Sequence, residues 1–381
     1  MTQLKNLLVG NGINCQFDHT SYTSSQIVLR ILKNCARLDF PSDIIVDSPL
    51  LLKDYLGTLF LNARKVIAGH YDVFALSPAE KESLYAFKDQ YSAKIVHLKM
   101  TDICFEDYYL LHDLTCHSIQ IGNPDQYTVR EAMRVAYLYA IYNDGKINEL
   151  YSKYPSHVID FLQHHDYIFT TNYDLNLEKA TGKSVNHLHG QFDRLSDVYN
   201  EESLRNHLPD CPIKGYNINP RYLYLYSNAI TTHSGSYKEF YITQTTTANA
   251  TIQKMANAYG TDPKIKEQVD TWLTCSNTLV NNLGHAIVLK ASNPGLCFSE
   301  QYDFASFERM SGELDILGLS PWNDFHIFRA INNSSIHNCT FYFYDKNDCE
   351  KVVELLPLLS TKGRLIFKSA DEIWEKRHAE E

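Results

Sequence analysis

The chain has 381 residues, of which 44% are hydrophobic and 21% charged, and its formal net charge is -10 at pH 7. This is the composition of an ordinary globular protein, long enough for one large domain or two smaller ones. Because phosphate binding depends on clustered Lys and Arg, the acidic balance excludes a protein whose whole surface binds nucleic acid. We expect no direct nucleic-acid binding.

The apolar segments predict neither export nor membrane insertion. The amino-terminal run Leu7-Leu8-Val9 is too short for the apolar core of a signal peptide, and no stretch approaches the about 18 apolar residues of a membrane span. The nine cysteines are scattered and include no Cys-x-x-Cys pair. We therefore expect a cytoplasmic protein with free thiols, and no disulfide framework, four-cysteine zinc site or membrane partner.

The first predicted elements are a strand, a glycine turn and a helix. Residues 4–9 form an apolar strand, Gly10-Asn11-Gly12 follows at once, and residues 25–36 have a helical pattern. Further helical patterns follow, of which 129–142 is the clearest, and residues 94–98 interrupt them with a strand-like run.

Strands and helices alternate again in the second half of the chain. The predicted strands are 167–171, 185–188, 314–317, 340–344 and 364–368, and the predicted helices are 172–180, 248–259, 263–282, 348–359, one after Asn323 and a last one opened by Ser369. This alternation predicts an α/β fold with a Rossmann-like parallel sheet and helices on both faces. We expect one such domain over residues 1–381, with mostly helical insertions at roughly 40–160 and 195–305 and no zinc ribbon.

The turn Gly10-Asn11-Gly12 is of a kind that binds nucleotides. Glycines between a strand and a helix let the backbone approach a diphosphate, which the amino terminus of the helix also attracts. The third glycine of the dinucleotide fingerprint is missing, because position 15 is Cys15, so a tight turn without a ligand explains these residues as well. Asn14 is placed either to reach a ribose or phosphate or to cap the following helix.

A second group of polar residues follows two neighbouring strands. Thr170-Thr171-Asn172-Tyr173-Asp174 stands at the carboxyl end of one strand, and His189-Gly190 ends the next. Open α/β sheets bind their ligands at this edge. An Asn holds a water or a ribose hydroxyl by hydrogen bonds, and a His, which titrates near neutral pH, removes a proton from a nucleophile.

The order of these motifs resembles that in the sirtuins. Sirtuins carry Thr-Gln-Asn-Ile-Asp, a helix, Ala-Gly, a short strand and His-Gly, and this chain has Thr170-Thr171-Asn172-Tyr173-Asp174, Ala180-Thr181-Gly182 and Leu188-His189-Gly190 in the same order. Gly10-Asn11-Gly12-Ile13-Asn14 is similar to the sirtuin Gly-Ala-Gly-Ile-Ser. Gly318-Leu319-Ser320 is similar to the later Gly-Thr-Ser turn.

The resemblance implies a site for NAD in which Asn172 and His189 are catalytic. Asn172 would position a water at the anomeric carbon and His189 would take a proton. The residues around the cofactor would be Gly10, Gly12, Asn14, Thr171, Asp174, Gly318 and Ser320, with the first two cradling the diphosphate and the last two contacting the adenosine half. Asp174 would stabilise developing positive charge or order its loop.

The cysteines separate this chain from the sirtuin deacylases. Those enzymes bind zinc through two cysteine pairs after the His-Gly segment, whereas Cys211 and Cys275 are isolated here. The resemblance therefore implies a sirtuin-like NAD hydrolase, an effector of bacterial antiphage defence that depletes NAD. NAD is then the substrate, no zinc is expected, and a homo-oligomer and a HerA-type hexameric ATPase are the partners that such relatives imply.

Several alternatives stay open from the residues. The chain is also compatible with an ADP-ribosyltransferase, a deacylase or a non-catalytic nucleotide-binding subunit of an ATPase or nuclease complex. His187 and His189 have the spacing of metal ligands on one strand face, without an acidic or sulfur partner nearby. Residues 323–326 either line the crevice or start a helix, and 222–226 predict a strand with one aromatic face.

Overall fold

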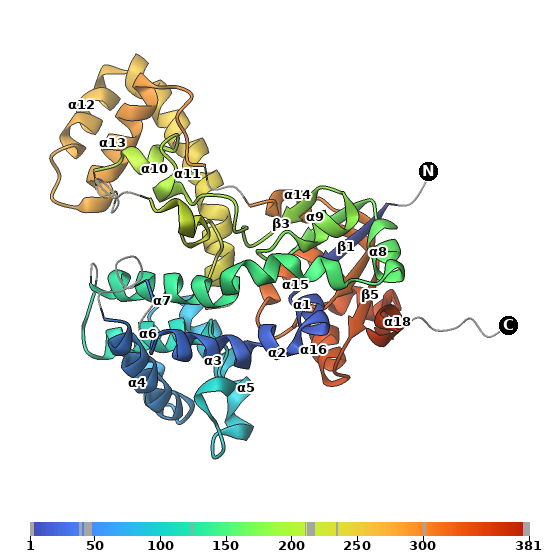
Figure 1. Ribbon diagram of the computed structural model, residues 1–381. Coiled ribbons are helices and arrows are strands. Elements are labelled where there is room, and N and C mark those ends of the chain that lie inside the picture. The colour runs from blue at the N-terminus through green and yellow to red at the C-terminus, as the bar shows by residue number, and fades with distance from the viewer. Residues whose placement is uncertain are drawn as a thin grey trace. The chain divides into compact units, whose positions relative to one another are not determined.

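The computed structural model describes residues 4–37, 40–41, 48–122, 125–209, 211, 218–233, 235–299 and 302–375 (Figure 1). The chain divides into two compact units. Unit 1 comprises Met1–Leu188, Ile230–Glu239 and Asp303–Glu381, and unit 2 comprises His189–Ala229 and Phe240–Tyr302. A single helix, α11 (Ser236–Thr261), begins in unit 1 and continues into unit 2.

Unit 1 contains a six-stranded sheet in which every neighbouring pair is parallel. Its strands are β1 (Lys5–Val9), β2 (Tyr167–Thr170), β3 (Val185–His187), β4 (Ser311–Leu317), β5 (Ser335–Phe343) and β6 (Leu365–Ser369). Their order is β3-β2-β1-β4-β5-β6, the order of a Rossmann sheet, so the predicted fold class is confirmed. Six of the predicted strands correspond to β1 to β6, although β5 begins already at Ser335.

The central strands β1 and β4 end in buried apolar residues, as expected where both faces of a parallel sheet are covered. Leu7, Leu8 and Val9 of β1 are completely buried, as are Ile316 and Leu317 of β4. The helices that follow strands in this unit are α1 (Gly12–Phe17), α9 (Asn176–Thr181), α15 (Phe325–Asn333), α16 (Asn347–Leu355), α17 (Pro357–Thr361) and α18 (Asp371–Trp374). Short helices α8 (Ser156–Gln163) and α14 (Phe304–Glu308) precede β2 and β4.

Helices fill the chain between β1 and β2. They are α2 (His19–Tyr22), α3 (Ser24–Asn34), α4 (Pro49–Ile67), α5 (Pro78–Tyr91), α6 (Asp107–Ser118) and α7 (Asp125–Tyr142). The predicted helices at 25–36 and 129–142 are α3 and α7. α5 starts with a capping box, in which the Ser77 hydroxyl accepts from the Glu80 N–H at 3.1 Å and the Glu80 carboxylate accepts from the Ser77 N–H at 2.7 Å.

Two predicted strands are wrong. After α5, a short 3-10 helix (Ser92–Lys94) ends within residues 94–98, and a turn follows it. Val96 is exposed in this turn and Leu98 is buried. A short apolar run does not distinguish a strand from such a turn. Residues 222–226 lie in another 3-10 helix, Pro220–Tyr226, because Pro220 occupies its first turn and the Asn219 side chain accepts from the Arg221 N–H at 3.0 Å.

Three predicted helices have different boundaries in the structure. The helix predicted at 172–180 begins only at Asn176, because the preceding residues form the loop after β2. Pro357 divides the helix predicted at 348–359 into α16 and α17. The helix predicted at 263–282 is two helices, α12 (Pro263–Trp272) and α13 (Thr278–Ser292), and Asn277 caps the second of them.

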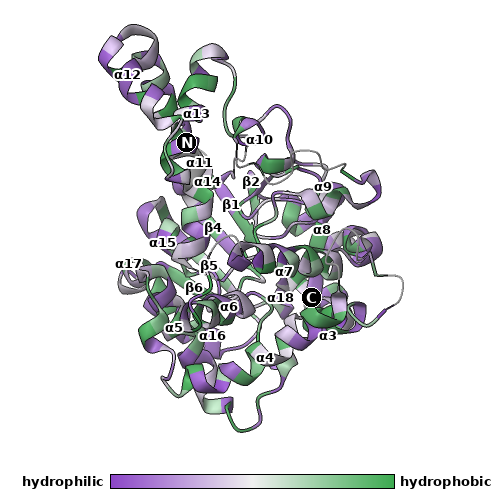
Figure 2. Ribbon diagram, turned by 90° about the vertical axis from the view of Figure 1, so that its left-hand side faces the viewer, coloured by the Kyte–Doolittle hydropathy of each residue, from purple (hydrophilic) through white to green (hydrophobic). Residues whose placement is uncertain are grey.

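Unit 2 is mostly helical. It contains α10 (Leu204–His207), the greater part of α11, α12 and α13, and its core clusters gather around Ile252 and Ala286 and around Val269 and Ile287. Figure 2 shows how hydrophilic and hydrophobic residues alternate along a helix such as α12, the pattern of a helix with one buried face. Among the described residues, no helix has the length and apolar character needed to cross a bilayer.

Candidate functional site

The loops after β1 and β4 touch at the centre of the sheet. The Gly10 N–H donates to the Leu317 carbonyl at 2.9 Å, and the Gly12 N–H donates to the Gly318 carbonyl at 2.8 Å. A Cβ atom on Gly12 would lie 2.5 Å from the Gly318 Cα, and Gly318 has a φ of +70°. These glycines are therefore required for the contact between the two loops. The chain reverses its strand order here, which is where open α/β sheets form their ligand crevice.

These hydrogen bonds change what Gly10 and Gly12 contribute. Their N–H groups donate to Leu317, the last residue of β4, and to Gly318, so a diphosphate at this edge has to be held by other donors. Ser320, which was predicted to contact the adenosine half, is exposed, and its hydroxyl accepts from the Trp322 N–H at 3.4 Å. The structure thus places Gly10, Gly12 and Gly318 together and keeps the Ser320 side chain at the surface.

Asn172 lies against the first glycine loop. Its backbone N–H donates to the Thr170 hydroxyl at 3.0 Å, which in turn donates to the Val9 carbonyl at 2.9 Å. The Asn172 side-chain amide donates to the Gly10 carbonyl at 3.3 Å, and the residue is buried. Thr171 is tied to the same strand, since its N–H donates to the Val9 carbonyl at 3.1 Å. A long amide hydrogen bond leaves Asn172 able to bind a second partner.

Asp174 orders the loop after β2. Its carboxylate accepts from the Asn14 amide at 2.7 Å and from the Asn176 N–H at 3.1 Å. Burial raises the pKa of Asp174, and the hydrogen bonds from Asn14 and Asn176 oppose that rise. Asn14 lies inside α1 and does not cap it; its side chain faces Asp174. The two predicted cofactor residues Asn14 and Asp174 are therefore hydrogen-bonded to each other.

His187 holds the backbone of Asn172, a role that sequence reasoning missed. Its Nδ1 lies 2.8 Å from the Asn172 carbonyl oxygen and its Nε2 lies 2.7 Å from the Glu178 carboxylate. Both partners only accept, so both contacts are made by the imidazolium, which has two N–H groups. Burial lowers the pKa of His187, but the hydrogen bond and the charge of Glu178 outweigh it and raise that pKa above its usual value. Neither ring nitrogen is available for a metal.

Replacing His187 by Gln is expected to destabilise unit 1 in a pH-dependent way. The folded pKa of His187 is raised, so its stabilisation is complete below the unfolded pKa and is lost as the pH rises through the folded pKa. We expect H187Q to lose about 1–2 kcal/mol of unfolding free energy at about pH 6 and clearly less at about pH 8.5. Urea unfolding at both pH values measures this difference. E178Q should show the same trend, and an equal loss at both pH values in H187Q would contradict the assignment.

His189 is the first residue of unit 2. It follows Leu188, whose N–H donates to the Thr170 carbonyl at 2.8 Å, so its peptide bond places it directly after β3. Gly190 has a φ of +82°, and a Cβ there would collide with the Asn228 backbone, which explains the glycine after His189. The catalytic pair predicted from the sequence thus follows two adjacent strands, β2 and β3.

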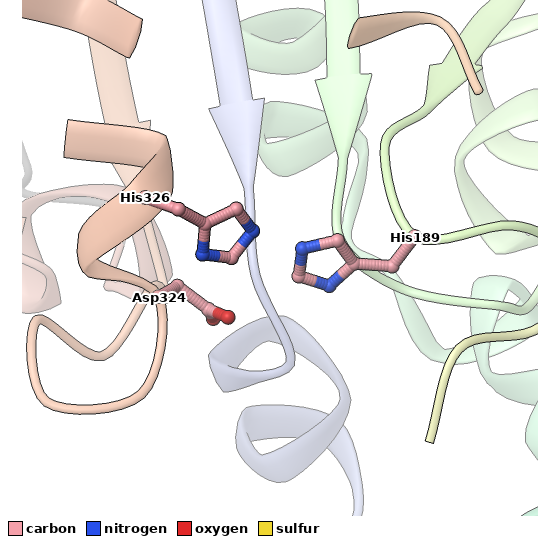
Figure 3. Close-up of side chains that lie close together, drawn as sticks. All are labelled: His189, Asp324 and His326. Atoms are coloured by element: carbon pink, nitrogen blue, oxygen red, sulfur yellow. The ribbon is translucent and has the colours of Figure 1, made fainter. Parts of the chain in front are cut away.

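Figure 3 draws His189 together with Asp324 and His326, residue types that bind metal ions. Asp324 and His326 come from the start of α15 in unit 1, the segment predicted either to line the crevice or to start a helix. His189 belongs to unit 2, and the Asp324 carboxylate is paired with the Lys238 ammonium at 3.1 Å. We assign no metal to these side chains.

The cysteines behave as the sequence predicts, because all nine are free thiols.

Comparison of the chain with protein-family profiles, with curated proteins and with solved structures found no match. The functional interpretation therefore depends on the residues of the site itself.

Proposed function

We propose that the protein hydrolyses NAD to nicotinamide and ADP-ribose. The observation that carries the proposal is the position of Asn172. Its buried amide contacts the Gly10 carbonyl beside the point where the loops after β1 and β4 meet. In a sheet with this strand order, a dinucleotide lies across that point with its reactive end at the carboxyl edge.

In the proposed reaction the bond between the anomeric carbon and the nicotinamide nitrogen breaks. The electron pair of that bond leaves with nicotinamide, and a water oxygen bonds to the anomeric carbon. Asn172 orients this water, and His189 takes its proton as general base. Asp174, which accepts from Asn14 and Asn176, keeps the loop of Asn172 in place.

The biological setting of the proposal rests on the resemblance to sirtuin-like defence proteins. In this proposal the protein acts in the cytoplasm as an antiphage effector that depletes NAD. An enzyme of this kind has to be inactive until triggered, because it would otherwise empty its own cell. Assembly into a homo-oligomer, or with a HerA-type hexameric ATPase, is the proposed means of control.

Product analysis tests the acceptor in this reaction. Purified full-length protein is incubated with NAD, and nicotinamide and free ADP-ribose are quantified. We expect equal amounts of the two products, since water is the acceptor. Nicotinamide without a matching amount of free ADP-ribose, together with ADP-ribose attached to protein, would indicate an ADP-ribosyltransferase. An acylated ADP-ribose formed only with an acyl-lysine peptide would indicate a deacylase, and nucleotide binding without turnover in every assembly state would indicate a non-catalytic subunit.

A further inference from the structure

Three charged side chains are buried together in unit 1. Lys238, Glu106 and Asp324 are 2%, 8% and 9% exposed. The Lys238 ammonium lies 3.0 Å from the Glu106 carboxylate and 3.1 Å from the Asp324 carboxylate. Ionic groups in such surroundings are costly to desolvate and contribute little net stability, so a role in fixing a particular arrangement of the chain is the more specific explanation.

The three residues come from distant parts of the chain. Glu106 directly precedes α6, and Lys238 lies in the first turn of α11. Asp324 directly precedes α15, in the loop after β4 that also carries Gly318 and Ser320. The Lys238 ammonium therefore reaches one of the two glycine loops of the candidate site through Asp324.

Ile230, which precedes Lys238 in the chain, also holds the loop after β2. The hydroxyl of Tyr173, which stands between Asn172 and Asp174, donates to the Ile230 carbonyl, and Tyr173 is buried. Burial raises the pKa of the Tyr173 hydroxyl, and the neighbouring charges of Glu106 and Lys238 act on it in opposite directions. The loop after β2 is thus bound to Ile230, and the loop after β4 is bound to Lys238 through Asp324.

The Lys238 ammonium offsets the cost of burying the carboxylates of Glu106 and Asp324. Burial raises the pKa of Glu106 to about 7, Lys238 opposes that rise and the charge of Asp324 adds to it. Without Lys238, two buried carboxyl groups would be left without a cation, and an unpaired buried charge is strongly destabilising. A variant that removes only Lys238 would therefore combine the cost of unpaired buried carboxylates with any effect on the loops. To separate the two effects, all three charges have to be removed together.

We propose that Lys238 is a positioning residue that holds the loops after β2 and β4 in the arrangement needed for NAD hydrolysis. Its ammonium pairs with Asp324 of the loop after β4, and Ile230, which precedes Lys238 in the chain, accepts from the Tyr173 hydroxyl of the loop after β2. Because Lys238 is in the first turn of α11, the position of that turn sets the position of the ammonium. The catalytic part of this inference rests on the proposed function.

The test compares wild type with the neutral triple variant K238M/E106Q/D324N, which removes the three charges of the cluster together. Amide hydrogen exchange is measured at 171–175 and 318–324, together with kcat and KM for NAD. We expect the triple variant to remain folded, to exchange at least about 10-fold faster in both loops, and to lose at least about 10-fold in kcat with a smaller change in KM. Wild-type protection and wild-type kcat in the folded variant would overturn the proposal.

A second ion pair of low exposure provides the matched control. Arg130 and Asp113 are 2.6 Å apart, with side chains 12% and 4% exposed, and this pair does not include Asp324. Arg130 also donates to the Thr232 hydroxyl. We expect R130M/D113N to leave exchange at 318–324 unchanged; equal acceleration there would show a general effect of lost buried charge and contradict the proposal. The exchange measurement decides the positioning role even if wild type does not hydrolyse NAD, in which case the proposed function fails separately.

Discussion

Replacing Gly12 by Ala is expected to lower the unfolding free energy of unit 1 by about 3 kcal/mol, because the new methyl group overlaps backbone. Its Cβ would lie 2.5 Å from the Gly318 Cα, and a backbone atom cannot move aside as the end of a flexible side chain can. Relief requires the loops after β1 and β4 to separate, which stretches the hydrogen bond between the Gly12 N–H and the Gly318 carbonyl. Chemical denaturation followed by tryptophan fluorescence and circular dichroism measures the loss.

Gly57→Ala is the matched control. Gly57 lies inside α4, and in the part of the chain that the structure describes no heavy atom outside the helix backbone and its neighbours lies within 4 Å of the position of its Cβ. Alanine in a helix interior is expected to raise the unfolding free energy by about 0.5–1 kcal/mol. The same substitution therefore has opposite signs at the two positions. A Gly12→Ala protein as stable as wild type would contradict the contact between the loops.

Replacing Asn172 by Ala is expected to lower kcat/KM for NAD by about 100- to 1000-fold, the usual loss when one preorganised hydrogen-bonding group is removed from an active site. Stability should change little. Within the described residues the side chain makes one hydrogen bond, at 3.3 Å to the Gly10 carbonyl, which contributes about 1 kcal/mol at most. Steady-state kinetics and urea unfolding on the same preparation separate the two effects.

Asn186 supplies a control of the same residue type. Its amide donates to the Ile168 carbonyl at 3.1 Å within the sheet, a hydrogen bond of the kind that Asn172 makes, but it lies in β3 and not in a loop at the carboxyl edge. Asn186→Ala is expected to show a similar change in stability with near-normal kcat/KM. Equal kinetic losses in the two variants would show that activity follows stability, and Asn172 would then have no special part in the reaction.

The sheet was predictable because its signals are local. The apolar run Leu7-Leu8-Val9 before two glycines, and the later strands that alternate with helices, identify a parallel sheet without information on distant contacts. Even the loop residues Asn172 and Asp174 could be placed at the edge of the sheet, since the motif that contains them follows a strand. The errors at 94–98 and 222–226 have the same origin, because short apolar or aromatic runs fit a strand and a helical turn equally well.

The residues that support the candidate site were not predictable in this way. His187 is close to Glu178 only because the chain turns back between α9 and β3. In the sequence, the alternation of His187 with His189 has the spacing of a metal pair instead. Lys238 meets Glu106 and Asp324 across 132 and 86 residues of sequence. Nothing in the local pattern around a lysine indicates that its ammonium is buried, so these partners emerge only from the tertiary structure.

The central claim is tested most directly by nicotinamide release from NAD. Wild type, Asn172→Ala and His189→Ala are measured alone and together with a HerA-type hexameric ATPase, the proposed partner, at equal protein concentrations. We predict that wild type releases nicotinamide and ADP-ribose in equal amounts, most rapidly in its assembled state, and that both variants lose this activity while remaining folded. Full hydrolysis by both variants, or no release by wild type in any assembly state, would contradict the assignment of Asn172 and His189 as the catalytic pair of an NAD hydrolase.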